Sequence, residues 1–190
     1  LGVDAWNSLD GGETWSELTP IWWEYSVHAD KHDFQWVGPN TAILATDGGA
    51  YRTEDHGETW TDIENLNNSQ FYRVECNPHN PGVYTGGAQD NGTTSGSYLD
   101  INSWTRDRGG DGFTPLFHPT NPNYRIATVQ WGNFAYSSDP STSPTPNWTD
   151  IEALAYDDRK GWDTPIILHP ANPDHIWTAT QRMWKMTGDP

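Results

Sequence analysis

The sequence predicts an all-β protein built from repeated four-stranded antiparallel units, and three observations lead to this fold class. Aromatic and turn-forming residues are abundant, with 12 Trp, 8 Tyr, 18 Gly and 14 Pro in 190 residues, which suits short strands joined by tight turns. A Ser/Thr-x-Asp-x-Gly-x-Thr-Trp motif occurs twice. Four tryptophans, Trp15, Trp60, Trp104 and Trp148, are separated by 45, 44 and 44 residues. That period is typical of four-stranded β-propeller blades of ~40–50 residues.

The repeated motif, at residues 8–15 and 53–60, describes a tight turn between two strands. Its Asp can accept backbone N–H bonds inside the turn, and its Gly can take a positive φ. The Thr and Trp then begin the next strand, with the indole buried beneath the turn. We therefore expect structural roles for two sets of residues: Ser8, Asp10, Gly12, Thr14 and Trp15, then Thr53, Asp55, Gly57, Thr59 and Trp60.

This motif resembles the Asp-box (BNR) repeat of β-propellers, which is found in sialidases, xyloglucanases and sortilin-type receptors. Residues 27–32, 47–49 and 89–92 look most like secreted bacterial propellers that are often described as BNR-repeat glycosyl hydrolases. The resemblance implies a propeller over essentially the whole chain, with the motif as a structural clasp away from the active face. It also implies an extracellular or periplasmic location, although the sequence contains no signal peptide.

The predicted strands divide the chain into whole and partial blades. Asn-Pro-His-Asn-Pro at 77–81 and His-Pro-x-Asn-Pro at 118–122 and 169–173 each separate two apolar runs, as a turn between the first two strands of a blade would. The prediction is an outer half-blade at 1–18, blades at 33–63, 71–106 and 113–151, and an inner half-blade at 165–190. Within the blade at 71–106, we expect residues 91–96 to be a decayed copy of the motif. Within the blade at 113–151, a Ser/Thr/Pro insertion stretches the copy between Ser138 and Trp148.

Half-blades at both ends would leave unpaired strand edges, which closed propellers avoid. One expectation is that the chain is a fragment of a longer propeller. The alternative is a homodimer in which each N-terminal half-blade completes the partner's C-terminal half-blade, giving an eight-bladed ring with one two-fold axis.

Composition limits the classes of partner. With 10 Lys and Arg against 26 Asp and Glu, the formal charge is −16, so nucleic acid and anionic membranes are unfavourable partners. No apolar run reaches membrane-spanning length, so membrane insertion is not expected. Cys76 is the only cysteine, and we expect it to be a buried core residue.

Acidic and amide side chains recur at the ends of the predicted second strands, where propeller ligands usually bind. Asp47, Gln89-Asp90, Gln130-Trp131 and Gln181 follow these strands and would form a polar ring. We predict that the ligand-binding residues are Gln89, Asp90, Gln130, Trp131, Trp162, Asp163 and Gln181. The alternative is that the polar groups only satisfy backbone N–H groups and water, while the tryptophans pack in the core.

The run from His28 to His32 is the sharpest local signal. On an extended segment His28, Asp30 and His32 would face the same side, where two imidazoles and a carboxylate could bind a divalent metal such as Zn²⁺. The alternative is that the three side chains hydrogen-bond one another. Asp111, which is flanked by Gly110 and Gly112, is the expected fourth residue of this metal site. One site would then hold His28, Asp30, His32 and Asp111. No other cofactor is expected.

Glycoside hydrolysis requires two carboxylates across a cleft. Asp30, Asp47, Asp90, Asp111 and Asp163 are available, and Asp30, Asp47 and Asp111 are the catalytic candidates. A sialidase is disfavoured, because the arginines are scattered and the Phe-Arg-Ile-Pro motif is absent. The sequence thus predicts an Asp-box propeller that recognises or hydrolyses an extracellular glycan. The alternative function is a non-catalytic scaffold of sortilin type that binds a protein or peptide.

Overall fold

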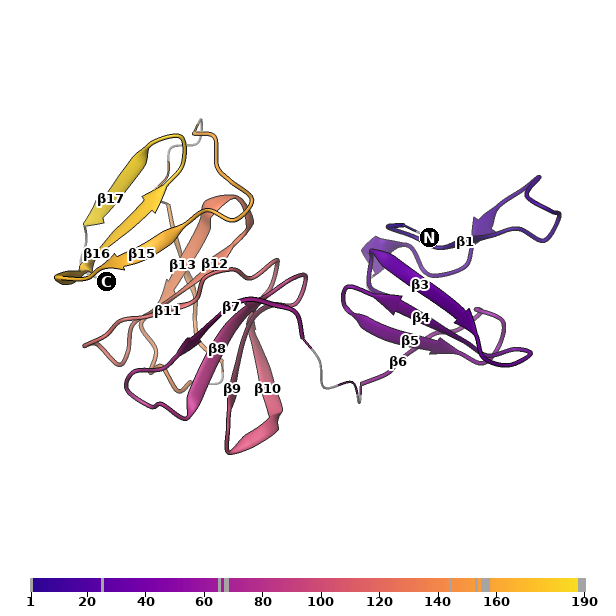
Figure 1. Cartoon of the computed structure of the whole chain (residues 1–190), viewed down its shortest axis with the longest axis horizontal. Coiled ribbons are helices and arrows are strands. Elements are labelled where there is room, and N and C mark those ends of the chain that lie inside the picture. The colour runs from indigo at the N-terminus through magenta and orange to yellow at the C-terminus, as the bar shows by residue number, and fades with distance from the viewer. Residues whose placement is uncertain are drawn as a thin grey trace. The chain divides into compact units, whose positions relative to one another are not determined.

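The computed structural model describes residues 2–24, 26–64, 66, 69–143, 145–152, 154 and 158–187 (Figure 1). These residues form antiparallel sheets and two single-turn 3₁₀ helices, η1 (Trp22–Glu24) and η2 (Gln130–Gly132). The chain divides into two compact units, residues 1–68 and 69–190, and each is described by itself. In the described ranges no helix has the length and apolar character needed to cross a membrane.

The first unit holds a two-stranded ribbon and one four-stranded sheet. The ribbon is β1 (Trp6–Asn7) with β2 (Ser16–Glu17), and it lies within the outer half-blade predicted at 1–18. The sheet has the order β3 (Lys31–Trp36), β4 (Ala42–Thr46), β5 (Gly49–Thr53) and β6 (Thr61–Asp62), so each strand pairs with the next in sequence. Val27, Leu44 and Tyr51 form its core, with Phe34 and Trp60 packed against them.

The second unit holds three sheets, each a meander of consecutive strands (Figure 1). One contains β7 (Phe71–Cys76), β8 (Val83–Ala88), β9 (Gly92–Ser97) and β10 (Asp100–Arg108). The next contains β11 (Leu116–Phe117), β12 (Arg125–Val129), β13 (Asn133–Ser137) and β14 (Thr149–Ile151). The last contains β15 (Ile166–His169), β16 (Asn172–Ala179) and β17 (Met183–Thr187), three strands where the sequence predicted an inner half-blade.

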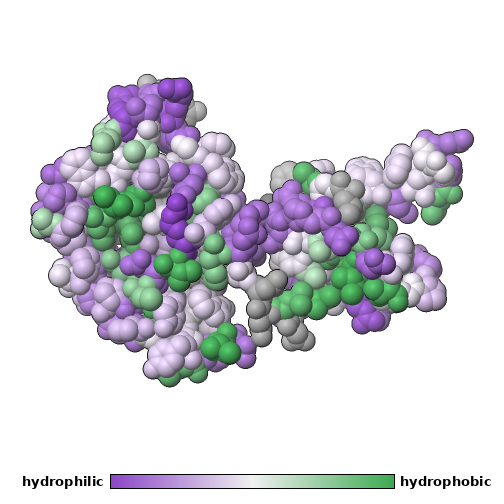
Figure 2. Space-filling view, viewed as in Figure 1, coloured by the Kyte–Doolittle hydropathy of each residue, from purple (hydrophilic) through white to green (hydrophobic). Residues whose placement is uncertain are grey.

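The core of the second unit joins its last two sheets. The buried cluster consists of Tyr124, Ile126, Phe134, Ile166 and Ile176. Burial raises the pKa of the Tyr124 hydroxyl to about 12, because the phenolate would lose its hydration. Figure 2 shows hydrophobic residues at the surface as well, scattered among hydrophilic ones in each unit.

The two copies of the repeated turn motif have the same hydrogen bonds. Asp55 accepts the Thr59 backbone N–H at 2.9 Å and the Thr59 hydroxyl at 2.6 Å. The Thr53 hydroxyl accepts the Gly57 N–H at 2.8 Å, and Gly57 has a φ of 96°. The first copy repeats this pattern, with distances of 2.8, 2.5 and 2.7 Å among Ser8, Asp10, Gly12 and Thr14. The motif is therefore a self-contained turn, as the sequence predicted.

The tryptophans that follow these turns differ in burial. The Trp60 indole N–H donates to the Leu18 carbonyl at 3.1 Å, so it ties the sheet to the preceding ribbon. Trp148 donates in the same way to the Asp107 carbonyl at 3.0 Å, which ties β14 to the neighbouring sheet. Trp15 is 62 % exposed, so the expected burial of its indole is wrong.

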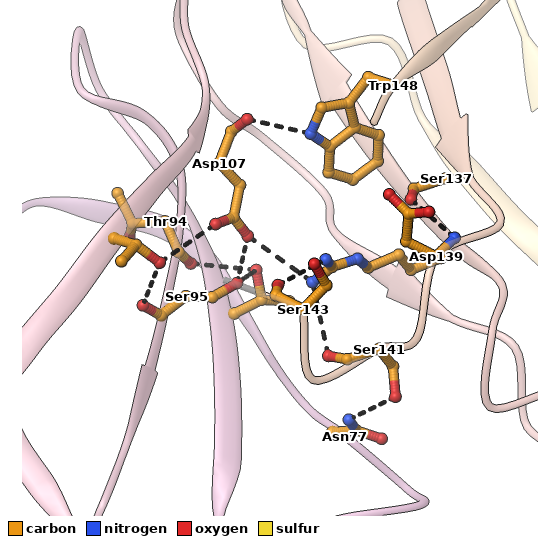
Figure 3. A network of polar contacts seen from close by, with 12 residues as sticks. Asn77, Thr94, Ser95, Asp107, Ser137, Asp139, Ser141, Ser143 and Trp148 are labelled. Carbon is orange, nitrogen blue, oxygen red and sulfur yellow. Dashed lines mark hydrogen bonds and ion pairs between the residues drawn. The ribbon is translucent and has the colours of Figure 1, made fainter. Parts of the chain in front are cut away.

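A buried ion pair reinforces the contact between β10 and β12 (Figure 3). Arg125 and Asp107 approach to 3.7 Å, with side chains that are 3 % and 1 % exposed. Ser95 and Thr105 donate hydroxyl bonds to the Asp107 carboxylate, and the Arg125 guanidinium lies 5.6 Å from the Trp148 ring centre. Desolvation raises the pKa of Asp107 and lowers that of Arg125, while each partner's charge opposes the shift.

Arg125 also fixes the insertion that precedes Trp148. Its guanidinium donates to the carbonyls of Ser141 and Ser143, and the Ser141 hydroxyl accepts a 2.8 Å bond from the Asn77 amide (Figure 3). Asp139 accepts the backbone N–H of Asn147 at 2.6 Å across the insertion. The stretched copy thus keeps an Asp-to-backbone bond, which closes over eight residues instead of four.

Two sequence expectations are wrong in the sheet of β7 to β10. Residues 91–96 are not a decayed turn, because Gly92–Ser97 is strand β9 and the turn to β10 lies at residues 98–99. Glycine and small hydroxyl residues suit this strand, since the Trp104 ring lies over Gly96. Cys76 is exposed instead of buried, because it ends the edge strand β7, where five of the six residues are exposed.

Candidate functional site

The turn between β12 and β13 presents an exposed tryptophan from a strained backbone. Trp131 has a φ of 62°, a region that bulky side chains rarely adopt, and its side chain is 52 % exposed. Its backbone N–H donates to the Trp162 carbonyl at 3.1 Å. Strained residues of this kind concentrate at functional sites. The turn therefore marks this end of the second unit as the candidate site.

Four aromatic rings from separate segments of the chain follow one another at this site. Trp131 and Trp162 meet edge to face, with ring centres 5.1 Å apart and planes at 79°. Trp162 contacts Phe113 at 6.0 Å, and Phe113 contacts Tyr72 of β7 at 4.7 Å. Phe113 is buried, whereas Trp131, Trp162 and Tyr72 are 52 %, 43 % and 40 % exposed. The three exposed rings thus form an aromatic corner over a buried ring.

The predicted polar residues next to this corner bond mainly to each other. Asp111, which is 7 % exposed, accepts the Asp90 backbone N–H at 3.1 Å and the Gln130 amide at 3.3 Å. The Gln130 amide oxygen accepts the Asp111 N–H at 3.2 Å. Asp90 has a φ of 56° and occupies the turn position that corresponds to Trp131. Asp111 therefore fixes the turns of two neighbouring sheets.

An ion pair connects β7 with the loop before β15. Arg73 donates to Asp163 at 2.6 Å, with side chains 49 % and 30 % exposed. The Tyr72 hydroxyl lies 3.4 Å from the amide oxygen of Gln89. The structure thus brings together Gln89, Asp90, Gln130, Trp131, Trp162 and Asp163 of the predicted ligand-binding set.

Gln181 does not occupy the predicted register. Strands β12 and β16 end at Val129 and Ala179, so Thr180, and not Gln181, corresponds to Gln130. Gln181 instead donates to Asp158 at 3.0 Å. Asp158 also accepts bonds from Thr180, Arg182 and the Trp184 indole, and these bonds, led by that of the Thr180 hydroxyl, lower its pKa to about 2. The error arose because sequence spacing does not show where a strand ends.

The predicted His28, Asp30 and His32 side chains do not alternate along an extended segment. Asp30 has a φ of 56°, and the strand begins only at Lys31. His28 packs against Gly48, where an added Cβ would lie 2.2 Å from its ring, and its Nδ1 lies 3.0 Å from the Ala29 carbonyl oxygen. The positive φ of Asp30 interrupts the extended backbone, so the regular alternation that was expected for these three residues is absent.

Asp47 joins two of these residues in the first unit. His32 pairs with Asp47 through its Nε2, and a carboxylate oxygen of Asp30 lies within 4.8 Å of one of Asp47. Asp111 belongs to the second unit and is described there.

Sequence reasoning missed Tyr72, Arg73, Phe113 and Asp158. The signal for Tyr72 and Arg73 was their position at the start of a first strand, next to predicted ligand loops. Asp158 carried no signal, since its four donors come from residues 180–184 and meet it only in the folded chain.

Comparison with solved structures finds β-propellers. An ancestral GH74 enzyme matches with a TM-score of 0.50 and 18% identity, over 82% of this chain and 22% of that one. YCF48 bound to D1 peptide matches with a TM-score of 0.48 and 14% identity, over 97% and 71%. The GH74 xyloglucanase from Xanthomonas campestris matches with a TM-score of 0.44 and 12% identity, over 78% and 27%. No protein-family model and no curated protein matches the sequence.

The likeness to the ancestral GH74 enzyme and the four-stranded meanders define the fold. The chain is a β-propeller protein with about four blades' worth of antiparallel sheet. It spans 22% of the length of that enzyme.

Proposed function

We propose that this chain is part of an Asp-box propeller that binds a glycan outside the cytoplasm, at the aromatic corner of Trp131, Trp162 and Tyr72. The observation that carries the proposal is the exposed, strained Trp131 held at 79° to Trp162. Exposed indoles offer apolar faces on which the C–H faces of sugar rings can pack, and nearby polar groups can orient sugar hydroxyls. The repeated turn motif, with its resemblance to secreted Asp-box propellers, supports an extracellular or periplasmic location.

The contacts of the acidic residues support binding without hydrolysis. Asp111 is buried and already accepts bonds from Asp90 and Gln130, and Asp163 is paired with Arg73. Hydrolysis requires one carboxyl group that donates a proton and a second that acts at the anomeric carbon. Carboxylates committed to structural bonds are poor candidates for either role. The use of these carboxylates in structural bonds also agrees with the alternative function, a non-catalytic scaffold.

Calorimetric titration with a panel of soluble oligosaccharides tests the proposal. We expect saturable binding that Trp131→Ala and Trp162→Ala each weaken by about tenfold, since stacking on one exposed ring contributes roughly 1 kcal/mol or more. Trp36→Ala is the matched control, because Trp36 is 45 % exposed but belongs to the first unit. Reducing-end release from the same sugars should stay at background.

Three results would count against this function. Binding that Trp36→Ala weakens as much as Trp131→Ala would move the site away from the corner. Release of reducing ends that Asp111→Asn abolishes would make the protein a hydrolase. Binding of peptides but of no sugar would favour the scaffold alternative.

A further inference from the structure

A crevice of about 420 Å³ lies beside the turn that carries Trp131, between the end of β10 and the sheet of β11 to β14. Its apolar wall includes Phe134, Ile151 and Leu154. Its charged lining consists of two cationic side chains, Arg108 and Lys160, and two carboxylates, Asp150 and the exposed Glu152. Its volume is in the range of small-molecule pockets. The crevice lies outside the aromatic corner, so what it binds is independent of the glycan proposal.

Arg108 is an incompletely satisfied donor in this crevice. Its side chain is 17 % exposed, and its Nη2 donates to Asp150 Oδ1 at 2.8 Å. Its Nη1 is shielded from solvent and has no hydrogen-bond acceptor among the residues that the structure describes. A desolvated guanidinium N–H without an acceptor is unfavourable, so an oxygen ligand that reached it would be favoured.

Asp150 is a weak competitor for this guanidinium. Its side chain is 74 % exposed, and ion pairs at the surface contribute little to stability. A carboxylate that replaced Asp150 would accept from Nη2, and it would accept from both Nη atoms once the guanidinium turned the shielded Nη1 toward the crevice. The bidentate arrangement is stronger and more specific than the single bond that the pair now makes.

Lys160 adds a second positive charge. It is partly buried, and within the described ranges its ammonium group makes no hydrogen bond or ion pair. Because Lys160 and Arg108 line the same crevice, one anion bound there could pair with both cations.

We propose that this crevice binds a small organic carboxylate with an apolar body. The carboxylate replaces Asp150 on Arg108 and pairs with Lys160, while the apolar body packs against Phe134, Ile151 and Leu154. Contact of the apolar body with this wall would remove water from beside the carboxylate and so strengthen both ion pairs. A carboxylate on a sugar, such as glucuronate, would satisfy the cations but leave the apolar wall poorly covered.

Calorimetric titration of the whole chain with sodium benzoate tests this site, with benzamide as the uncharged analogue. We expect benzoate to bind about tenfold more tightly than benzamide or glucuronate, and Lys160→Met to weaken benzoate by a similar factor. Asp150→Asn should strengthen benzoate binding several-fold, because it removes the competing carboxylate. This increase distinguishes a binding site from a merely structural ion pair.

Lys185→Met is the control, since Lys185 is an exposed lysine on β17 that does not line the crevice. Equal binding of benzoate and benzamide, or equal effects of Lys160→Met and Lys185→Met, would overturn the proposal. The proposal would also fail if neither benzoate nor hexanoate, a second carboxylate with an apolar body, bound saturably. It would fail as well if Asp150→Asn bound benzoate more weakly than the wild type. If glucuronate bound more tightly than benzoate, the ligand would be a sugar acid, and the proposal of a carboxylate with an apolar body would be wrong.

Discussion

At the scale of single residues, Asp55 connects the turn motif to stability. Its carboxylate accepts both the backbone N–H and the hydroxyl of Thr59, and the Thr53 hydroxyl donates to it at 2.7 Å. We expect Asp55→Ala to lower the melting temperature by several degrees, because a turn N–H loses its acceptor. Glu58→Ala is the control in the same turn, since the Glu58 side chain is exposed. An unchanged melting temperature for Asp55→Ala would contradict a structural role.

The same carboxylate gives stability a defined pH dependence. The hydrogen bonds from Thr59, followed by that from Thr53, lower the Asp55 pKa from 3.8 to about 2. Between these values the unfolded chain binds more protons than the folded one, so stability rises with pH across this window. The stabilisation is complete above pH 4 and is lost as the pH falls through 2. Acid titration of the melting temperature should show a flatter slope for Asp55→Ala than for the wild type.

Two substitutions of Trp131 can test whether its backbone conformation is strained, because both remove the same indole. Trp131→Ala and Trp131→Gly both remove the indole, but only glycine adopts the observed φ of 62° without strain. We expect the glycine variant to be more stable than the alanine variant by about 1 kcal/mol in chemical denaturation. Neither variant should bind the glycan tightly. An alanine variant as stable as the glycine variant would mean that the turn stores no strain.

At the scale of elements, the two indole bonds between neighbouring sheets should be equivalent. Trp60 donates to Leu18 and Trp148 donates to Asp107, at 3.1 and 3.0 Å. We expect Trp60→Phe and Trp148→Phe each to cost about 1 kcal/mol of unfolding free energy, because the ring is mostly retained while a carbonyl loses its donor. Trp15→Phe serves as the control, as Trp15 is largely exposed. A cost for Trp15→Phe equal to the other two would contradict this explanation.

These elements also indicate what the sequence could predict. The turn motif predicted its turns correctly, because its hydrogen bonds join residues only four positions apart. The tryptophan period predicted the repeated sheets, because successive sheets use a similar length of chain. Residues 91–96 were misread because a glycine-rich strand and a turn have similar local composition, and packing under Trp104 decides between them.

The candidate site was predictable only in part, for a related reason. The predicted Gln130, Trp131 and Trp162 do meet at the aromatic corner. Arg73 and Asp163 are 90 residues apart, so no local pattern indicated their ion pair. Asp30 reverses the alternation around it through its positive φ, which the residue type alone did not require.

At the scale of the whole molecule, stability should be unevenly distributed. Strand β12 lies between β11 and β13, and all five of its residues are buried. Strands β1 and β2 have two residues each and only a single neighbour. Local opening requires the least energy where few apolar contacts are lost. We therefore expect amide hydrogen exchange, followed by mass spectrometry, to be slowest in β12 and fast in the β1–β2 ribbon.

A pair of isoleucine variants tests whether β12 exchanges through unfolding of its core. Ile126 is 2 % exposed within the cluster of Tyr124 and Phe134, whereas Ile167 is 57 % exposed. Ile126→Val should lower the unfolding free energy by about 0.5–1.5 kcal/mol and speed β12 exchange in proportion, since one buried methyl is lost. Ile167→Val should leave both quantities nearly unchanged. Equal acceleration by the two variants would mean that β12 opens locally, independently of the core against which it packs.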